Sequence, residues 1–269
     1  MLESIAFVPS DSVLIMLFCA AFIAGIVDAI AGGGGLITVP SLLLAGVPPL
    51  TALGTNRLQA VIGELTSFVT YLWHREVNLS GLLLGMIATA VGATAGSFAV
   101  SLFPADILRA LLPILMVAIT VYSILSKRLK NVVAEQAKVS SRTFMLSMGL
   151  IIGFYNGFFG PGTGAIWMIA FAILLGYTIK QASIATKPLN LMGNLVSLIF
   201  FISISSVNYQ IGLVMGVAQV LGAVLGSKVV IRNGDRVVRP IFITVTLLMT
   251  VKLIYETGTG PVLAFVTGH

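Results

Sequence analysis

The chain has 269 residues, of which 58% are hydrophobic and only 9% are charged, and its mean hydropathy is +1.07. Because an average soluble domain carries about 25% charged residues, this composition indicates an integral membrane protein surrounded by the lipid bilayer. The net charge of +6 does not indicate nucleic-acid binding, since basic residues gather in two short segments, 126–143 and 228–239. Such clusters are typical of the cytoplasmic loops of membrane proteins.

Seven apolar runs each approach the roughly 20 residues that a helix needs to cross the hydrocarbon layer. A longer apolar region, 144–175, is interrupted by Gly160-Pro161-Gly162. The sequence therefore predicts an all-α integral membrane protein with about eight transmembrane segments. The seven runs are 12–31, 58–73, 81–103, 107–126, 182–204, 209–231 and 237–255.

An internal repeat organises these segments. The segment that begins at Gly25 recurs at Gly153 (153 − 25 = 128), and a later segment recurs with an offset of 130 (193 − 63 = 130). We therefore predict two repeats of four segments each, residues 1–126 and 144–269, joined by a basic cytoplasmic linker at 127–143. The first offset pairs Asp28 with Asn156, Gly32 with Gly160 and Gly34 with Gly162, and the second pairs Arg57 with Lys187, Glu64 with Asn194 and Gly92 with Gly222.

The first segment of each repeat contains a Gly-rich break, which predicts a helical hairpin. If both basic segments face the cytoplasm, the chain between them crosses the membrane an even number of times, so 144–175 enters and leaves on the same side. The same reasoning makes 12–45 a hairpin that enters from outside. Each repeat then makes an odd number of crossings, and the two repeats are inverted relative to each other. If 12–31 spans the membrane by itself, the repeats are instead parallel; we favour the inverted arrangement.

The Gly-rich turns are candidates for a binding site. Paired Gly-interrupted segments in two halves of a chain point to a transporter's substrate site, and non-helical backbone in a membrane must be buried in protein or line a wet cavity. A turn that leads into a helix presents N–H groups and the positive end of the helix dipole, which attract anions. Glycines can also serve only close helix packing, as expected for Gly92 and Gly222. The predicted turn residues are Gly32, Gly33, Gly34, Gly35, Gly160, Pro161, Gly162 and Thr163, with positive φ angles expected at the glycines.

A polar stripe in each repeat extends this candidate site. Positions 57, 60, 64 and 67 share one face of a helix, as do 187, 190, 194 and 197. Charges inside a membrane are costly and usually face a pathway, although Arg57 and Lys187 could instead reach towards the membrane surface. Asp28 and Glu64 could neutralise Arg57, carry a coupling proton or cap a hairpin. The predicted residues of the stripes are Arg57, Glu64, Lys187, Asn190 and Asn194.

Four motifs together resemble one known family. They read Gly25-x-x-Asp-Ala-Ile-Ala-Gly-Gly-Gly-Gly35, Ala52-Leu-Gly-Thr-Asn56-Arg-Leu-Gln59, Gly157-Phe-Phe-Gly-Pro-Gly-Thr-Gly164 and Ala185-Thr-Lys187. In combination they resemble the TauE/SafE family of sulfite exporter-like membrane proteins, over essentially the whole chain. The resemblance implies transport of sulfite, sulfoacetate or related sulfonates and carboxylates across the bacterial cytoplasmic membrane, and it adds Asn56 and Gln59 to the candidate site.

We therefore predict a secondary transporter that moves a small anion by alternating access, with the anion bound between the two hairpin turns. The single Cys19 supplies no disulfide or metal framework, and no nucleotide-binding motif is present, so we expect no cofactor, no metal and no ATP-driven step. A passive anion channel would share these features. An intramembrane enzyme is disfavoured because no Ser-His, paired Asp or His-x-x-His arrangement lies within the spans. The sequence is also compatible with a homo-oligomer.

Overall fold

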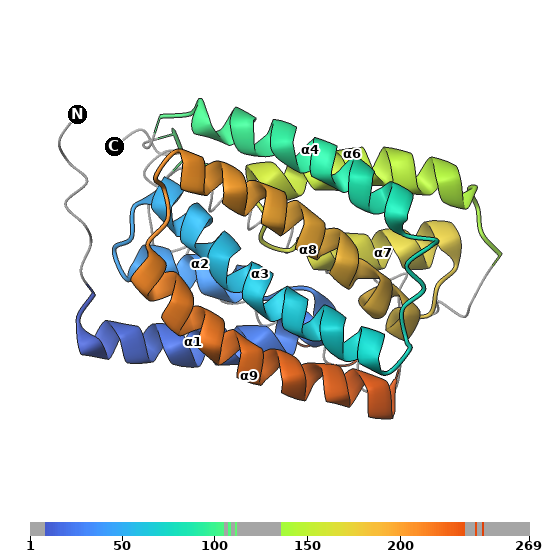
Figure 1. Ribbon diagram of the computed structural model, residues 1–269, viewed down its shortest axis with the longest axis horizontal. Coiled ribbons are helices and arrows are strands. Elements are labelled where there is room, and N and C mark those ends of the chain that lie inside the picture. Colours follow the sequence, from blue (N-terminus) through green and yellow to red (C-terminus); the bar gives the residue numbers. More distant parts are fainter. Residues whose placement is uncertain are drawn as a thin grey trace, which may run out of the picture.

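The computed structural model describes residues 9–104, 107, 108, 111, 136–234, 240 and 244. Within this part of the chain the fold is entirely helical, with eight named helices (Figure 1). The predicted segments 107–126 and 237–255 and most of the linker 127–143 lie outside the described residues. The helices are α1 Asp11–Ala31, α2 Gly35–Leu44, α3 Pro49–Trp73, α4 Leu83–Ser101, α6 Ser141–Phe158, α7 Thr163–Leu175, α8 Ile179–Ser203 and α9 Tyr209–Asn233.

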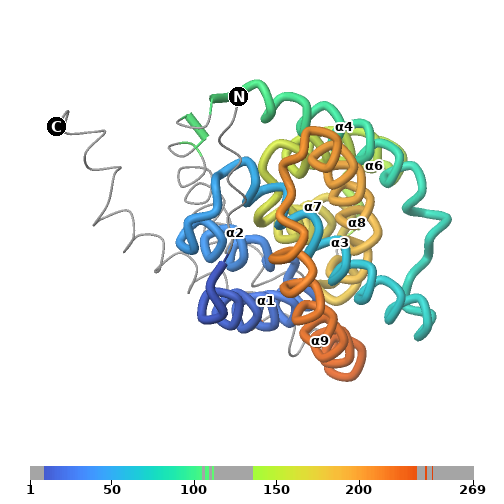
Figure 2. Tube along the Cα trace, turned by 60° about the vertical axis from the view of Figure 1, so that its left-hand side comes forward, coloured from blue at the N-terminus to red at the C-terminus, as the bar shows by residue number. Residues whose placement is uncertain are grey.

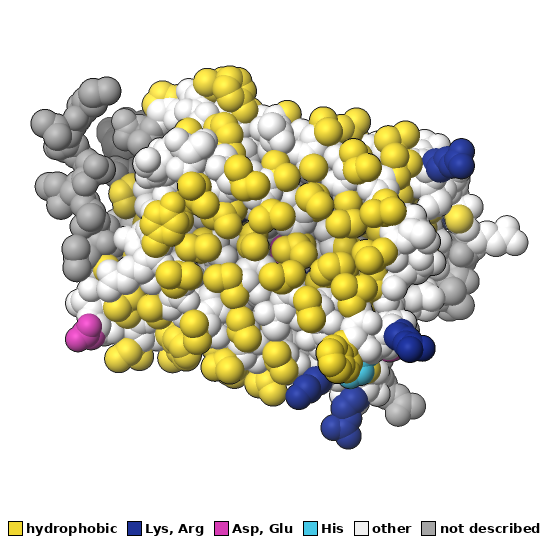
Figure 3. Space-filling view, in the orientation of Figure 1, with side chains coloured by type: hydrophobic (Ala, Val, Ile, Leu, Met, Phe, Trp, Pro, Cys, Tyr) yellow, Lys and Arg dark blue, Asp and Glu magenta, His cyan; other side chains and the backbone are white. Residues whose placement is uncertain are grey.

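The outer surface is apolar, as a membrane protein requires. Four of the described helices, α1, α4, α8 and α9, are long and apolar enough to cross a membrane. Large side chains point outward from them, such as Ile87 and Val217, whereas small and polar residues such as Gly92 and Gln219 face inward. Figure 3 shows hydrophobic side chains covering the middle of the molecule and Lys and Arg gathered at one end.

Two hydrophobic clusters mark the opposite ends of the molecule. One joins Leu17 of α1 and Leu42 of α2 to the first turns of α3 and α9. The other joins Phe144 of α6 and Leu175 of α7 to the end of α3, the start of α8 and the end of α9. Exposed basic residues of the described chain flank the helix ends of this second cluster, so the two basic segments meet at one end. These residues are Arg75, Lys138, Arg142, Lys228 and Arg232.

Both Gly-rich breaks form the turns of helical hairpins, as the sequence predicts. The outer ends of α1 and α2 share one cluster and those of α6 and α7 share the other, so the hairpins enter from opposite ends. The backbone is left-handed at Gly32, Gly160 and Gly162, with φ of +68°, +92° and +80°, which favours glycine. Our expectation was wrong at Gly33, Gly34 and Gly35, which have no positive φ; at Gly34 φ is −55°. Glycine is required there because a Cβ would lie 2.8 Å from the Cβ of Asp28.

The helix α6 begins earlier than predicted, at Ser141, inside the segment assigned to the linker. Its start is fixed by Ser140, whose side chain accepts a hydrogen bond from the backbone N–H of Thr143. A serine in this position satisfies an N–H group that the first helical turn leaves without a partner.

The first helix of each hairpin packs in parallel against one further helix. The helices α1 and α9 lie side by side along one edge, and α4 and α6 along the other, with α3 and α8 between them (Figures 1 and 2). Any side chain at Gly222 would overlap the backbone of α1, and any side chain at Gly92 would overlap that of α6. The structure therefore confirms the predicted packing role of these two glycines.

The helices α3 and α8 cross the centre in antiparallel directions. At one end the N–H of Asn208, just after α8, donates to Thr55 Oγ1 at 2.9 Å. Farther along α3, Glu64 accepts a hydrogen bond from Asn194 of α8, also at 2.9 Å. This antiparallel pair carries both polar stripes into the space between the hairpin turns.

Candidate functional site

The two hairpin turns meet at a small polar cavity in the middle of the molecule. A Cβ on Gly35 would lie 3.0 Å from Cα of Pro161, and Gly32 touches the backbone of Gly164. The cavity has a volume of about 20 Å³, which is close to the space that one water molecule needs. Its walls are Asp28, Gly32, Gly35, Asn56, Arg57, Ala60, Glu64, Gly160, Gly162, Gly164, Asn190, Asn194 and Gln219.

Arg57 is the cation of this cavity and is only 1% exposed. Its Nη1 donates to Asn156 Oδ1 at 2.8 Å and to Asn194 Oδ1 at 2.6 Å, and its Nη2 donates to the main-chain oxygen of Asn156. Its Nε has no hydrogen-bond partner. Within the described residues no carboxylate forms an ion pair with it. Amides and a carbonyl therefore hold the guanidinium in place without neutralising its charge.

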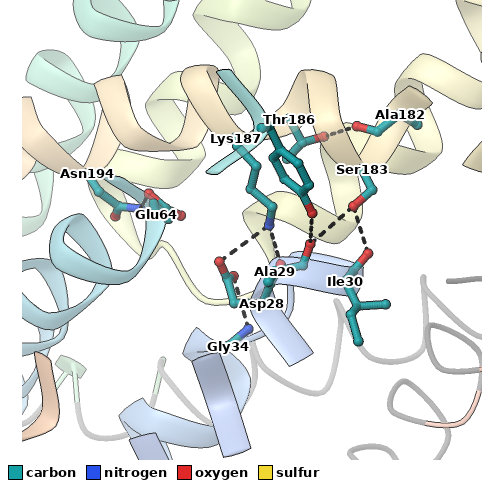
Figure 4. A network of polar contacts seen from close by, with 11 residues as sticks. Asp28, Ala29, Ile30, Gly34, Glu64, Ala182, Ser183, Thr186, Lys187 and Asn194 are labelled. Atoms are coloured by element: carbon teal, nitrogen blue, oxygen red, sulfur yellow. Dashed lines mark hydrogen bonds and ion pairs between the residues drawn. The ribbon is translucent and has the colours of Figure 1, made fainter. Parts of the chain in front are cut away.

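Lys187, the counterpart of Arg57, is fully buried but does not line the cavity. Its Nζ donates to the main-chain oxygen of Asp28 and lies 3.4 Å from Asp28 Oδ2 (Figure 4). The other carboxylate oxygen of Asp28 accepts the N–H of Gly34 at 3.3 Å. Asp28 therefore caps the first hairpin through Gly34. Its ion pair is with Lys187 and not with Arg57.

The two cations make equivalent contacts. Arg57 binds residue 156, and Lys187 binds residue 28, in each case through both the main-chain oxygen and the side chain. Because these pairs correspond in the internal repeat, each central helix holds the hairpin of the other repeat in the same way. The difference is electrical: Asp28 neutralises Lys187, whereas Asn156 leaves Arg57 charged.

Glu64 lies on α3 and is 3% exposed. Its Oε2 accepts the side-chain N–H of Asn194 at 2.9 Å (Figure 4). Since Asn194 also accepts a hydrogen bond from Arg57, a single amide separates the two opposite charges. A buried carboxylate that is hydrogen-bonded to a neutral amide therefore lies in the wall of the cavity.

The remaining predicted residues divide between the cavity wall and its support. Asn56 and Asn190 line the cavity, and the Oδ1 of Asn190 has no partner. Gln59 lies behind the wall, where its Nε2 donates to Asn56 Oδ1 at 2.8 Å. Pro161 accepts the hydroxyl of Tyr155 through its carbonyl. Gly33, Gly34, Pro161 and Thr163 shape the turns without lining the cavity.

The candidate site of the sequence analysis left out three residues of the wall, namely Ala60, Gly164 and Gln219. Gln219 of α9 lines the cavity, is 2% exposed and has an Oε1 without a partner. A glutamine in the middle of an apolar span is itself a signal, because polar side chains are costly there. Gly164 was present in the motifs and Asn156 in the repeat pairing, but neither was placed in the candidate site.

Comparisons with known proteins identify the family of the chain. The sequence model described as "Sulfite exporter TauE/SafE" matches residues 17–253. The chain belongs to the TauE/SafE sulfite exporter family. Curated relatives of this TauE/SafE protein are named probable membrane transporter proteins, which fits a membrane transporter rather than an enzyme. No solved structure matches the chain.

Three of these relatives are each 38% identical to the chain. ORF9 of Sinorhizobium sp. matches 90% of this chain and 93% of its own length. A relative from Haemophilus influenzae matches 91% and 96%, and YfcA of Escherichia coli K12 matches 93% and 93%. The similarity therefore extends over nearly the whole of each protein, including both hairpins.

Proposed function

We propose that this TauE/SafE protein is a secondary transporter of a small anion, namely sulfite or an organosulfonate or carboxylate such as sulfoacetate, in the bacterial cytoplasmic membrane. The observation that carries the proposal is the buried guanidinium of Arg57, which lines a cavity and is held by amides and a carbonyl, with no carboxylate in ion-pair contact among the described residues. A guanidinium binds oxyanions through several aligned N–H groups. The N-termini of α2 and α7 meet at the same cavity, and helix N-termini favour negative charge.

The cavity is too small for the proposed anions. A volume of about 20 Å³ holds about one water molecule, and sulfite or a carboxylate is larger. The hairpin turns must therefore separate before an anion can reach Arg57. We propose that this separation occurs alternately on the two sides of the membrane, since each turn belongs to a hairpin that enters from a different end.

We further propose that the two repeats are inverted. Three observations support this arrangement. The helix α1 packs against α9 as its counterpart α6 packs against α4, and the two hairpins enter from opposite ends. The counterparts Glu64 and Asn194 also contact each other. Contact between counterparts is expected near a pseudo-two-fold axis, as in inverted-repeat transporters. Single cysteines at Ser10 and Ser140, in a Cys19→Ala background, test the topology. An impermeant reagent on intact cells should label position 10 and spare 140; labelling of both or of 140 alone would contradict it.

Flux measurements test the proposed function itself. Purified protein in liposomes should take up labelled sulfite, methanesulfonate or acetate at a rate that saturates with concentration. Unlabelled anion inside the liposomes should accelerate uptake, because a carrier returns faster when loaded. Flux that rises without saturation would indicate a channel, and absence of flux for all three anions would contradict anion transport.

A further inference from the structure

Four charged side chains are buried in the described part of the protein: Asp28, Arg57, Glu64 and Lys187. Two are cations and two are carboxylates, so their charges sum to zero when all are ionised. Lys187 and Asp28 form an ion pair, and Asn194 connects Arg57 to Glu64. These four buried charges are thus balanced among themselves.

An anion that binds Arg57 would upset this balance. It would add a negative charge to a buried site whose wall already includes the carboxylate of Glu64. Uncompensated charge in a poorly polarisable interior is costly, and buried ionisable groups respond by changing their protonation. One proton, bound within the same cavity, would restore neutrality for a singly charged anion.

We propose that Glu64 binds this proton, so that the protein carries an anion and a proton together. The inference rests on the proposed anion transport and names its coupling ion. The proton comes from water on the side to which the cavity opens and binds a carboxylate oxygen of Glu64; no other bond changes. Release of the anion on the other side makes Glu64 acidic again, and the proton leaves to water there.

Glu64 suits this role better than the other buried carboxylate. Protonation of Asp28 would weaken its ion pair with Lys187 and its cap on Gly34, which hold the first hairpin. Glu64 is held instead by the neutral side chain of Asn194. The cavity also offers acceptors for a new O–H donor, because two buried amide oxygens in its wall have no partner. They are Asn190 Oδ1 and Gln219 Oε1.

The charged groups around Glu64 are few. Arg57 faces the cavity from the same helix, Asp28 reaches it from α1, and Lys187 lies behind Asp28 on α8. The helices α2 and α9 contribute no charged side chain to the cavity wall described above; α9 contributes only Gln219. Since Asp28 and Lys187 compensate each other, the group whose protonation most changes the field on a bound anion is Glu64.

The pH dependence of anion affinity tests the proposal. Methanesulfonate is the probe, because its charge does not change near neutral pH. Protonation of Glu64 and anion binding favour each other, so the affinity for methanesulfonate should be highest at low pH. The affinity should fall by up to about tenfold per pH unit in the range between the pKa of Glu64 in the free protein and its pKa in the loaded protein. Glu64→Gln mimics the protonated form and should bind at every pH as tightly as wild type does at low pH.

One control variant and one direct measurement make the test decisive. Glu76→Gln removes a surface carboxylate that pairs with Lys180 and should keep the wild-type pH dependence. In weakly buffered solution, methanesulfonate should draw about one proton into the wild-type protein and none into Glu64→Gln. A slope that persists in Glu64→Gln, or anion binding without proton uptake, would overturn the coupling while leaving anion transport intact. If neither methanesulfonate, sulfite nor acetate binds, the proposed function itself fails, and the coupling with it.

Discussion

Replacing Arg57 with alanine tests the candidate site most directly, because this side chain is the cation that lines the cavity and its hydrogen-bond partners are neutral. Loss of one partner from a buried, hydrogen-bonded charge pair costs about 2–5 kcal/mol of binding free energy. That loss corresponds to a roughly 30-fold to 5,000-fold weaker affinity. We therefore expect Arg57→Ala to bind sulfite or methanesulfonate at least about 30-fold more weakly than the wild type.

The stability of the same variant should change much less than its contacts suggest. Arg57 makes three hydrogen bonds to Asn156 and Asn194, each worth about 1.5–3 kcal/mol for a charged donor. Removing the buried guanidinium also relieves a desolvation cost of several kcal/mol, so the two effects largely offset each other.

Calorimetry and thermal unfolding of detergent-purified protein measure the two quantities separately. Arg75→Ala is the matched control, since Arg75 is an exposed arginine just beyond the end of the same helix. The control should bind and melt like the wild type. If Arg57→Ala kept wild-type affinity, Arg57 would serve only to hold the second hairpin in place, and the anion site would lie elsewhere.

Two other predictions concern stability and the turns. Lys187→Ala should lower the free energy of unfolding by about 3–5 kcal/mol, because it leaves the carboxylate of Asp28 buried without a cation; denaturant unfolding should show that adding Asp28→Asn restores most of the loss, and no rescue would contradict the ion-pair explanation. Gly162→Val should abolish flux with a small change in melting temperature, because it strains a left-handed turn in the cavity wall by about 1–2 kcal/mol. Gly92→Ala should do the reverse, since its methyl group would push α4 away from the backbone of α6; proportional losses of flux and stability in both variants would show that the turn is only structural.

Much of the site could be predicted from sequence because its signals are local. Four consecutive glycines in an apolar run indicate a turn whatever the rest of the fold is. The helical period places Arg57, Glu64 and Asn194 on inward faces. The structure brings these three side chains to one cavity, together with glycines of both turns. The internal repeat added further candidate residues, because a polar or Gly residue in one half indicated the corresponding position in the other half.

The partners of the two cations could not be predicted in the same way. Treating Lys187 as the equivalent of Arg57 placed both in the anion site, yet only Arg57 lines the cavity. The difference arises from one substitution in the repeat, Asp28 against Asn156, whose effect depends on a contact between residues 159 positions apart. No local pattern reports such a contact. Gln219 was missed because its counterpart, Thr89, is too weakly polar to draw attention to the pair.

This substitution also provides a way to test why the second hairpin carries an amide. Asn156→Asp gives the second hairpin the residue that the first one has at Asp28. Its carboxylate would lie where the amide oxygen now lies, 2.8 Å from Arg57 Nη1, and would neutralise the guanidinium. Because close buried charge pairs couple by about 1.5 kcal/mol or more, anion affinity should fall at least about tenfold.

Aspartate at position 156 can still accept the hydrogen bond from Arg57 Nη1, so the melting temperature should not fall. Asn208→Asp is the control: it adds the same charge at the N-cap of α9, where aspartate serves as well as asparagine, and it should leave affinity unchanged. If Asn156→Asp bound methanesulfonate as tightly as the wild type, a neutral partner for Arg57 would not be what makes the cavity an anion site. If affinity fell only in Asn156→Asp, the two hairpins would be held by equivalent contacts to a cation, and only Arg57, whose partner is neutral, would bind the anion.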